Sequence, residues 1–186
     1  MKAQISKTLI ILALIVFSGC SQLSRMHQKA IDSSEAGNYN KALQLYHKIL
    51  QKKPEKPLYL NDYGWTLFMV DSLEKSIQVL EKARKNLGDR KVLLGRAIKR
   101  NLTIAQSYME ARTYLVNNEP QKALETLSKN KLYRSREMEL VYYGLIYEKL
   151  GEKEKAEERW QKIIDTYAEV EFDNKFYDMA LKKMKN

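Results

Sequence analysis

The sequence predicts an all-α protein, and three observations lead to that prediction. Only three prolines and seven glycines are spread over 186 residues, so few positions interrupt a helix. Apolar residues recur at intervals of three and four along most of the chain, which is the period of a half-buried helix. No window alternates apolar and polar residues for long enough to make a convincing strand.

A short helical segment recurs along the chain. The copies are residues 36–50, 70–84, 117–130 and 150–164, and the first two begin 34 residues apart. In three of them a turn residue is followed five positions later by a small residue, and four positions after that by a large apolar residue. The last copy shows the pattern with Gly151, Ala156 and Trp160. The copy at 117–130 keeps Ala123 and Leu127 in the same register.

Matching helices precede two of these copies. One carries Leu60, Tyr63, Gly64 and Leu67 on a single face, and the other carries Leu140, Tyr143, Gly144 and Tyr147. Glycine in the middle of each face lets a second helix approach closely. The sequence therefore predicts pairs of helices that pack on one another.

These residues resemble the tetratricopeptide repeat, a helix–turn–helix unit of 34 residues. The resemblance implies a right-handed α-solenoid of about four helix pairs over residues 23–170, at about 23–56, 57–90, 104–136 and 137–170. The first repeat is weak at Lys29 and Ser33, and the third is weak at Glu110 and Asn130. In this family the first helices of successive repeats line a concave groove that holds peptide segments of other proteins.

Two segments fall outside the four repeats. An insertion at 91–103 continues the helical spacing, so we expect one elongated helix from about Asp89 to Val116. The alternative is a degenerate extra repeat with its close-packing point at Leu94–Gly95. Residues 171–186 are predicted to form a C-terminal capping helix, 174–185, begun by Asp173. The residues expected to cover the open end of the stack are Phe172, Phe176, Met179 and Ala180.

The first twenty residues have the order of a secretory signal. Lys2 and Lys7 precede an unbroken apolar stretch from Leu9 to Phe17, and Ser18-Gly19 lead to Cys20, the only cysteine. One alternative is an uncleaved membrane anchor, but nine apolar residues fall well short of the roughly 20 that span a bilayer. An ordinary signal peptide with an accidental cysteine is the other alternative.

The segment before Cys20 resembles the lipobox of bacterial lipoproteins, although Phe17 stands where leucine is usual. The resemblance implies cleavage of a signal peptide at 1–19, a lipidated N-terminus at 20–22 and acyl chains on Cys20. We therefore expect a lipid-anchored protein of the bacterial cell envelope. Ser21 is not the aspartate that retains many lipoproteins in the inner membrane, which favours the outer membrane, facing the periplasm, if the organism is Gram-negative.

The chain is strongly basic, with a formal net charge of +10. Cleavage before Cys20 removes two lysines and no acid, which lowers the charge by two to +8. We expect no nucleic-acid partner, because an exported protein rarely meets nucleic acid. A basic patch is predicted at Arg90, Lys91, Arg96, Lys99 and Arg100, either as a solvated surface or as a contact for an anionic cell-wall polymer.

No catalytic pattern, cofactor motif or metal site is found, since neither His27 nor His47 has a second ligand at metal spacing. We expect a scaffold or adaptor for other envelope proteins rather than an enzyme. The alternative is a structural lipoprotein that binds wall polymer through the basic patch. Candidate groove residues are His27, Ile31, Asn61, Trp65, Phe68, Tyr108, Arg112, Val141 and Leu145. Trp65 and Phe68 could instead pack in the core.

Overall fold

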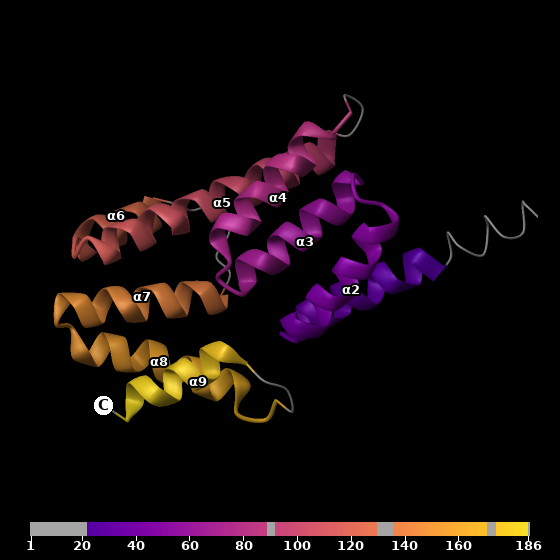
Figure 1. The fold of residues 1–186 in the computed structure, drawn as a ribbon. Coiled ribbons are helices and arrows are strands. Elements are labelled where there is room, and N and C mark those ends of the chain that lie inside the picture. Colours follow the sequence, from indigo (N-terminus) through magenta and orange to yellow (C-terminus); the bar gives the residue numbers. More distant parts are fainter. Residues whose placement is uncertain (1–21, 89–91, 130–135, 171–173, 186) are drawn as a thin grey trace, which may run out of the picture.

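The computed structural model describes residues 22–88, 92–129, 136–170 and 174–185, and these ranges are almost entirely helical, without a strand. The described part of the first helix covers residues 22–35. It is followed by α2 (Tyr39–Lys52), α3 (Pro57–Met69), α4 (Leu73–Lys85), α5 (Val92–Val116), α6 (Pro120–Lys129), α7 (Arg136–Leu150), α8 (Lys153–Tyr167) and α9 (Lys175–Met184). Consecutive helices run in opposite directions and stack into a curved array (Figure 1). The predicted all-α solenoid is confirmed.

Each of the four helix pairs turns at one residue with left-handed backbone. The φ angles are 78° at Gly37, 59° at Asp71, 60° at Asn118 and 74° at Gly151. In three of the turns the next residue donates its N–H to a carbonyl five residues earlier, at 2.8 to 2.9 Å. These pairs are Ser72 with Leu67, Glu119 with Tyr114, and Glu152 with Tyr147. This is the Schellman arrangement, which satisfies carbonyls at a helix end and reverses the chain.

The helices of a pair approach most closely at a glycine. A Cβ atom added to Gly64 would lie 2.7 Å from Cγ of Leu80 on α4, and one added to Gly144 would lie 2.6 Å from the Trp160 ring on α8. Ser76 of α4 also donates a hydrogen bond to the Gly64 carbonyl at 2.7 Å. The small residues therefore have the packing role that the sequence predicts.

The same register shows which residue replaces glycine at the close-packing position of the two weak copies. Gly64 and Gly144 each stand seven positions before the left-handed residue of their turn, and the corresponding positions in the other pairs hold Ala30 and Ala111. Both alanines are completely buried. Alanine has the next smallest side chain and still allows the two helices of a pair to approach closely. All four pairs therefore pack in the same way.

The elongated helix is present as α5, a single helix of 25 residues. The alternative of a separate extra repeat at Leu94–Gly95 is therefore wrong. Gly95 is nevertheless a close-packing point, because a Cβ added there would lie 2.9 Å from Cδ2 of Leu87 in the segment after α4. The predicted cap Asp89 lies outside the described residues.

The C-terminal helix α9 packs on α8 and buries Phe176 and Ala180, as predicted. Its cap differs from the prediction. The Asn174 side chain accepts hydrogen bonds from the N–H groups of Phe176 and Tyr177, at 2.9 and 3.3 Å. The helix therefore begins one residue later than a cap at Asp173 implies. Asp173 and Phe172 lie outside the described residues.

The array curves until its first and last pairs meet. Tyr39, at the start of α2, belongs to the same core cluster as Tyr167 of α8 and Phe176 of α9. The Lys175 ammonium group of α9 also donates a hydrogen bond to the Val70 carbonyl, in the turn between α3 and α4. Contacts so remote in sequence close the inner side of the solenoid at this point (Figure 1).

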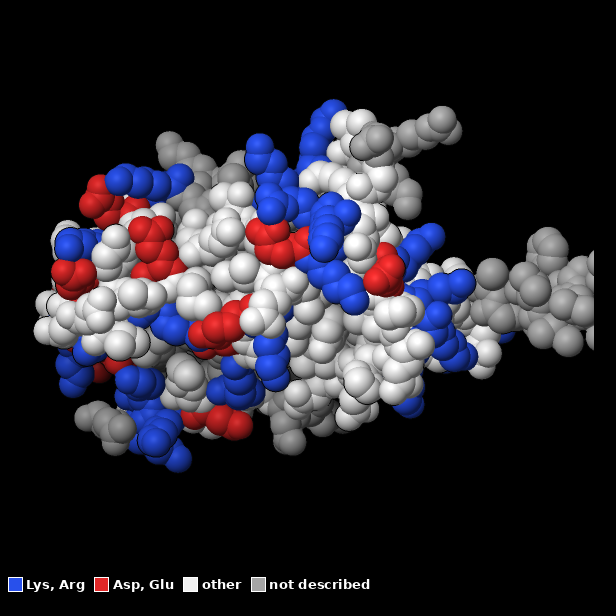
Figure 2. Space-filling view, turned by 45° about the horizontal axis from the view of Figure 1, so that its top comes forward, with Lys and Arg blue, Asp and Glu red and all other residues white. Residues whose placement is uncertain are grey.

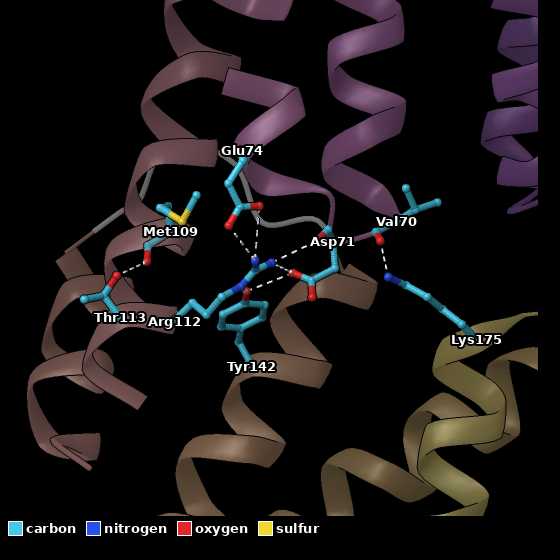
Figure 3. Close-up of polar contacts among 8 residues, drawn as sticks. All are labelled: Val70, Asp71, Glu74, Met109, Arg112, Thr113, Tyr142 and Lys175. Carbon is cyan, nitrogen blue, oxygen red and sulfur yellow. Dashed lines mark hydrogen bonds and ion pairs between the residues drawn. The ribbon is translucent and has the colours of Figure 1, made fainter. Parts of the chain in front are cut away.

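A network around Arg112 holds the turn between α3 and α4 against α5 and α7 (Figure 3). Arg112 Nη2 donates to the Asp71 carboxylate at 2.7 Å and to the Asp71 backbone carbonyl at 2.8 Å. Arg112 Nε donates to the Tyr142 hydroxyl at 3.2 Å, and that hydroxyl donates to Asp71 Oδ1 at 2.8 Å. Burial opposes the charge on Arg112, but the hydrogen bonds that Arg112 donates to Tyr142 and Asp71 outweigh it and raise the Arg112 pKa.

We predict that Gly144→Ala lowers the free energy of unfolding by about 1–2 kcal/mol. Overpacking against the Trp160 ring costs about 1–3 kcal/mol, and alanine recovers up to about 1 kcal/mol of helix propensity. Urea denaturation followed by circular dichroism measures the change. Gly88→Ala is the matched control, because no atom lies within 4 Å of a Cβ added to Gly88. Equal stability of the two variants would contradict the close-approach argument.

We also predict that Arg112→Gln and Tyr142→Phe are energetically coupled. Arg112→Gln should cost about 1–3 kcal/mol, because it leaves part of the hydrogen-bonding capacity of Asp71 and Tyr142 unsatisfied. The double-mutant cycle should give a coupling energy of at least about 0.5 kcal/mol. Arg84→Gln serves as the control, since its ion pair with Glu81 is exposed and should contribute little. Strictly additive changes in the free energy of unfolding would show that Arg112 and Tyr142 do not act as one network.

Candidate functional site

A cavity of about 550 Å³ opens on the inner side of the array. Its walls come from first helices of successive pairs, with Ile31 from the first helix, Trp65 from α3, Asn101 from α5 and Glu137 from α7. The start of α2 contributes Tyr39. The volume lies within the range typical of ligand sites. The cavity thus lies where the array closes, between the first pair and the start of α7.

A line of hydrogen bonds crosses the cavity wall and joins three helices. His27 Nε2 lies 2.8 Å from Asp62 Oδ2, and Asn61 Nδ2 donates to Asp62 Oδ1 at 2.9 Å. Asn101 Nδ2 donates to Asn61 Oδ1 at 3.1 Å. Asn61 and Asn101 are buried, so their bonds compensate the cost of burying two amides. The line fixes the orientation of the Asp62 carboxylate in the wall.

The cavity is acidic although the whole chain is basic. Glu35, Asp62 and Glu137 are among its lining residues, with Arg100 as the one lysine or arginine among them. Burial, and after it the carboxylates of Asp62 and Glu35, raises the pKa of Tyr46. Burial, and after it Glu137, does the same for Tyr39. Both phenols therefore sense a negative potential on this side of the protein.

Aromatic side chains supply the apolar part of the walls. Tyr39, Tyr46 and Trp65 line the cavity. Trp65 stacks on Phe68, with ring centroids 4.9 Å apart and an interplanar angle of 27°. Aromatic faces beside carboxylates form an environment that suits a cationic side chain.

The groove predicted from sequence corresponds to this cavity in part. Ile31, Asn61 and Trp65 line it, and His27 contacts it through Asp62. Leu145 is half-buried and packs on the main core. Arg112 belongs to the network with Asp71 and Tyr142, so its assignment to the groove is wrong.

Three further groove candidates, Phe68, Tyr108 and Val141, lie in the core, which corrects their assignment. The rings of Phe68, Tyr108 and Tyr142 touch edge to face across α3, α5 and α7, with centroids 5.1 and 4.9 Å apart. Successive first helices are in direct contact there, so no groove remains between them.

Most of the residues that line the cavity were not predicted from sequence, among them Glu35, Tyr39, Asn101 and Glu137. Asn101 carried a signal, because it is an amide within the apolar stripe of the elongated helix. The other three stand at helix ends. They lie in the cavity because of the curvature of the array, which cannot be predicted from a local sequence pattern.

The remaining candidates are exposed or lie outside the described residues. Arg96, Lys99 and Arg100 are exposed on α5, and Arg100 borders the cavity. Arg90, Lys91 and Cys20 lie outside the described residues. Within the described ranges, no His, Cys, Asp or Glu side chains cluster as a metal site requires. None of the described helices combines the length and apolar character needed to cross a bilayer.

Comparison with known proteins bears on the last helix pair. Residues 140–169, which span most of α7 and all of α8, match the family model of the tetratricopeptide repeat. No curated protein sequence matches the chain. The matched pair contains the close contact of Gly144 with Trp160 and the left-handed turn at Gly151. The chain therefore contains a repeat of a kind that generally mediates protein–protein interaction.

Proposed function

We propose that the protein is a lipid-anchored adaptor of the bacterial cell envelope, built throughout from tetratricopeptide-like repeats. In this proposal acyl chains on Cys20 hold it at a membrane, and the cavity receives a segment of a partner protein. The observation that carries the binding role is the cavity itself, whose walls come from successive first helices. The proposal includes no catalytic step.

The composition of the cavity suggests the chemistry of the partner segment. Three carboxylates, the guanidinium group of Arg100 and three aromatic rings surround a space large enough for one or two side chains with their backbone, so acidic groups outnumber basic ones. A lysine or arginine side chain gains from both groups, through ion pairs with the carboxylates and through cation–π contact. We therefore assign the cavity to a peptide segment that presents a basic side chain.

The anchoring part of the proposal is supported by the sequence around Cys20. A basic lead, a short apolar stretch and a small pair precede the only cysteine of the chain. Two or more acyl chains at one point anchor a protein stably, whereas a single chain does so only marginally. Residue 22 already belongs to the helical array and stands two positions after Cys20, so in this proposal the adaptor is held close to the membrane.

We predict that the protein binds short peptides with a central arginine and not those with a central glutamate. The probes are acetylated nonapeptides that differ only at that central position. Fluorescence of Trp65 in the cavity wall reports binding, and Trp160 is buried elsewhere and gives a constant background. Glu35→Gln combined with Asp62→Asn should weaken arginine-peptide binding about fivefold, as expected for about 1 kcal/mol of ion pairing.

The matched control for that experiment is Glu125→Gln. This glutamate lies on α6, is exposed and pairs with Lys129 outside the cavity. It should leave the affinity unchanged. Equal binding of the arginine and glutamate peptides would contradict the proposal that the acidic cavity binds basic segments. The same holds if the control variant weakens arginine-peptide binding as much as the double variant does.

We predict that a bacterial host attaches labelled palmitate to the wild-type chain and shortens it by the first nineteen residues. Cys20→Ser should abolish both label and cleavage, because the cysteine sulfur is the atom that is acylated. Ser21→Ala is the control and should be processed normally. Gel electrophoresis with detection of the label gives the answer. Label on the Cys20→Ser protein, or none on the wild type, would rule out the anchor.

A further inference from the structure

The alternating directions of the helices give the array two opposite edges. One edge, here called the amino-terminal edge, contains residue 22 of the first helix, the connection between α2 and α3, the end of α4 and the start of α5. Figure 1 shows these parts along one side of the molecule. The opposite edge contains the four left-handed turns.

Exposed apolar side chains concentrate on the amino-terminal edge. Five large hydrophobic residues are exposed in the described part of the chain, and three of them, Leu58, Val92 and Leu93, lie on this edge. Leu93 is 79% exposed and Val92 is 61% exposed, both at the first turn of α5. The other two, Val116 and Met184, lie at the far ends of α5 and α9.

The same edge is rich in basic side chains. The segments that form it carry exposed Lys52, Lys53, Lys56, Lys82, Arg84 and Lys85, with Glu55 and Glu81 as the acids among them. Among the described residues, no ion pair of 4 Å or less includes Lys53, Lys56, Lys82 or Lys85. Figure 2 shows blue side chains toward the end that carries the first helix, and blue mixed with red at the other end.

The edge is one packed unit rather than a set of separate loops. Asn86, after α4, donates a side-chain hydrogen bond to the Glu55 carbonyl between α2 and α3, at 3.4 Å. Beneath it, Leu60, Ala83 and Ile98 form a core cluster that joins α3, α4 and α5. The start of α5 is thus held in place while Val92 and Leu93 point away from that core into solvent.

Helix dipoles account for only part of this pattern. Basic residues near the ends of α2 and α4 are favoured by the negative ends of those helices. The same holds for Lys53, the C-cap residue of α2. The dipole does not account for Lys56, which stands at the positive end of α3, or for apolar residues exposed at the start of α5. Apolar side chains flanked by lysine and arginine are typical of surfaces that enter the headgroup region of an anionic membrane.

We propose that the amino-terminal edge lies on a bilayer surface containing anionic lipids, with Val92 and Leu93 inserted among the headgroups. Residue 22, on this edge, stands two positions after Cys20, so the proposed acyl anchor would bring this same edge to the membrane. The inference rests on the proposed function for that anchor. The charge and the exposed apolar side chains support it independently. Docking in this orientation leaves the opposite edge, with its four turns, directed away from the membrane.

The test compares two single tryptophan substitutions in the full chain, Leu93→Trp and Val116→Trp. The two sites are 79% and 78% exposed on opposite ends of the same helix, so neither change should disturb folding, which circular dichroism checks. Each variant is mixed with vesicles of phosphatidylglycerol and phosphatidylcholine whose acyl chains are brominated. Bromine quenches only a tryptophan that reaches the acyl boundary. The emission that Leu93→Trp adds to that of Trp65 and Trp160 should be quenched about twofold, and the emission added by Val116→Trp should not be quenched.

The charge dependence supplies a second readout. Quenching of Leu93→Trp should fall to the parental level in pure phosphatidylcholine and at about 1 M salt, where the Debye length is only about 3 Å. Adding Lys53→Gln, Lys56→Gln and Lys85→Gln should reduce it as well. The matched control adds Lys41→Gln, Lys75→Gln and Lys153→Gln, which are exposed at the opposite edge, and should retain it.

Equal quenching at both tryptophan positions, or none at Leu93→Trp, would overturn the proposal. Quenching at Leu93→Trp that does not depend on the lipid charge would overturn the electrostatic part of the proposal. The purified protein in this experiment carries no acyl chain. Failure of the lipidation test therefore leaves this result intact, and failure here leaves lipidation and cavity binding intact.

Discussion

The reversal of the chain at a left-handed residue is the constraint on which the rest of the structure depends. Glycine adopts this conformation freely, whereas Asp71 and Asn118 adopt it at an energetic cost that short polar side chains reduce. The first helix of the next pair contacts each of these two side chains, because Arg112 of α5 binds Asp71, and Lys149 Nζ of α7 donates to Asn118 Oδ1 at 3.3 Å. Each turn sets the angle between the two helices of its pair, which approach closely at Gly64 in one pair and at Gly144 in another. The four turns together set the curvature of the array.

That curvature produces the cavity. Where first helices touch directly, as at Phe68, Tyr108 and Tyr142, aromatic rings fill the inner surface. Toward the first pair the helices diverge, and the line from His27 through Asp62 and Asn61 to Asn101 borders an open space. The polar inner wall thus depends on one repeated turn. We propose this wall as the surface for a protein segment, and the basic amino-terminal edge as the surface for a membrane.

The repeat could be predicted from sequence, because close packing imposes small residues at a regular spacing. Its close contacts are those of Gly64 with Leu80 and of Gly144 with Trp160. The elongated helix α5 was predictable for a similar reason, since its apolar period runs unbroken. The inner residues were predictable only in part. Helical spacing tells which face of a helix Phe68 or Tyr108 occupies, but not whether the neighbouring helix covers that face. The acidic cavity residues Glu35 and Glu137 come together only through the overall curvature, and local patterns do not report it.

The measurement that tests the adaptor role most directly is photocrosslinking in the native envelope. A photoreactive phenylalanine analogue replaces Ile31 in the cavity wall or, as the control, Ser128 on the exposed side of α6. The account predicts a covalent product with a specific partner protein from position 31 and none from position 128. Peptide mapping should place the attachment beside a lysine or arginine of the partner. The same product from both positions, or none from position 31 in the folded and anchored protein, would contradict the account.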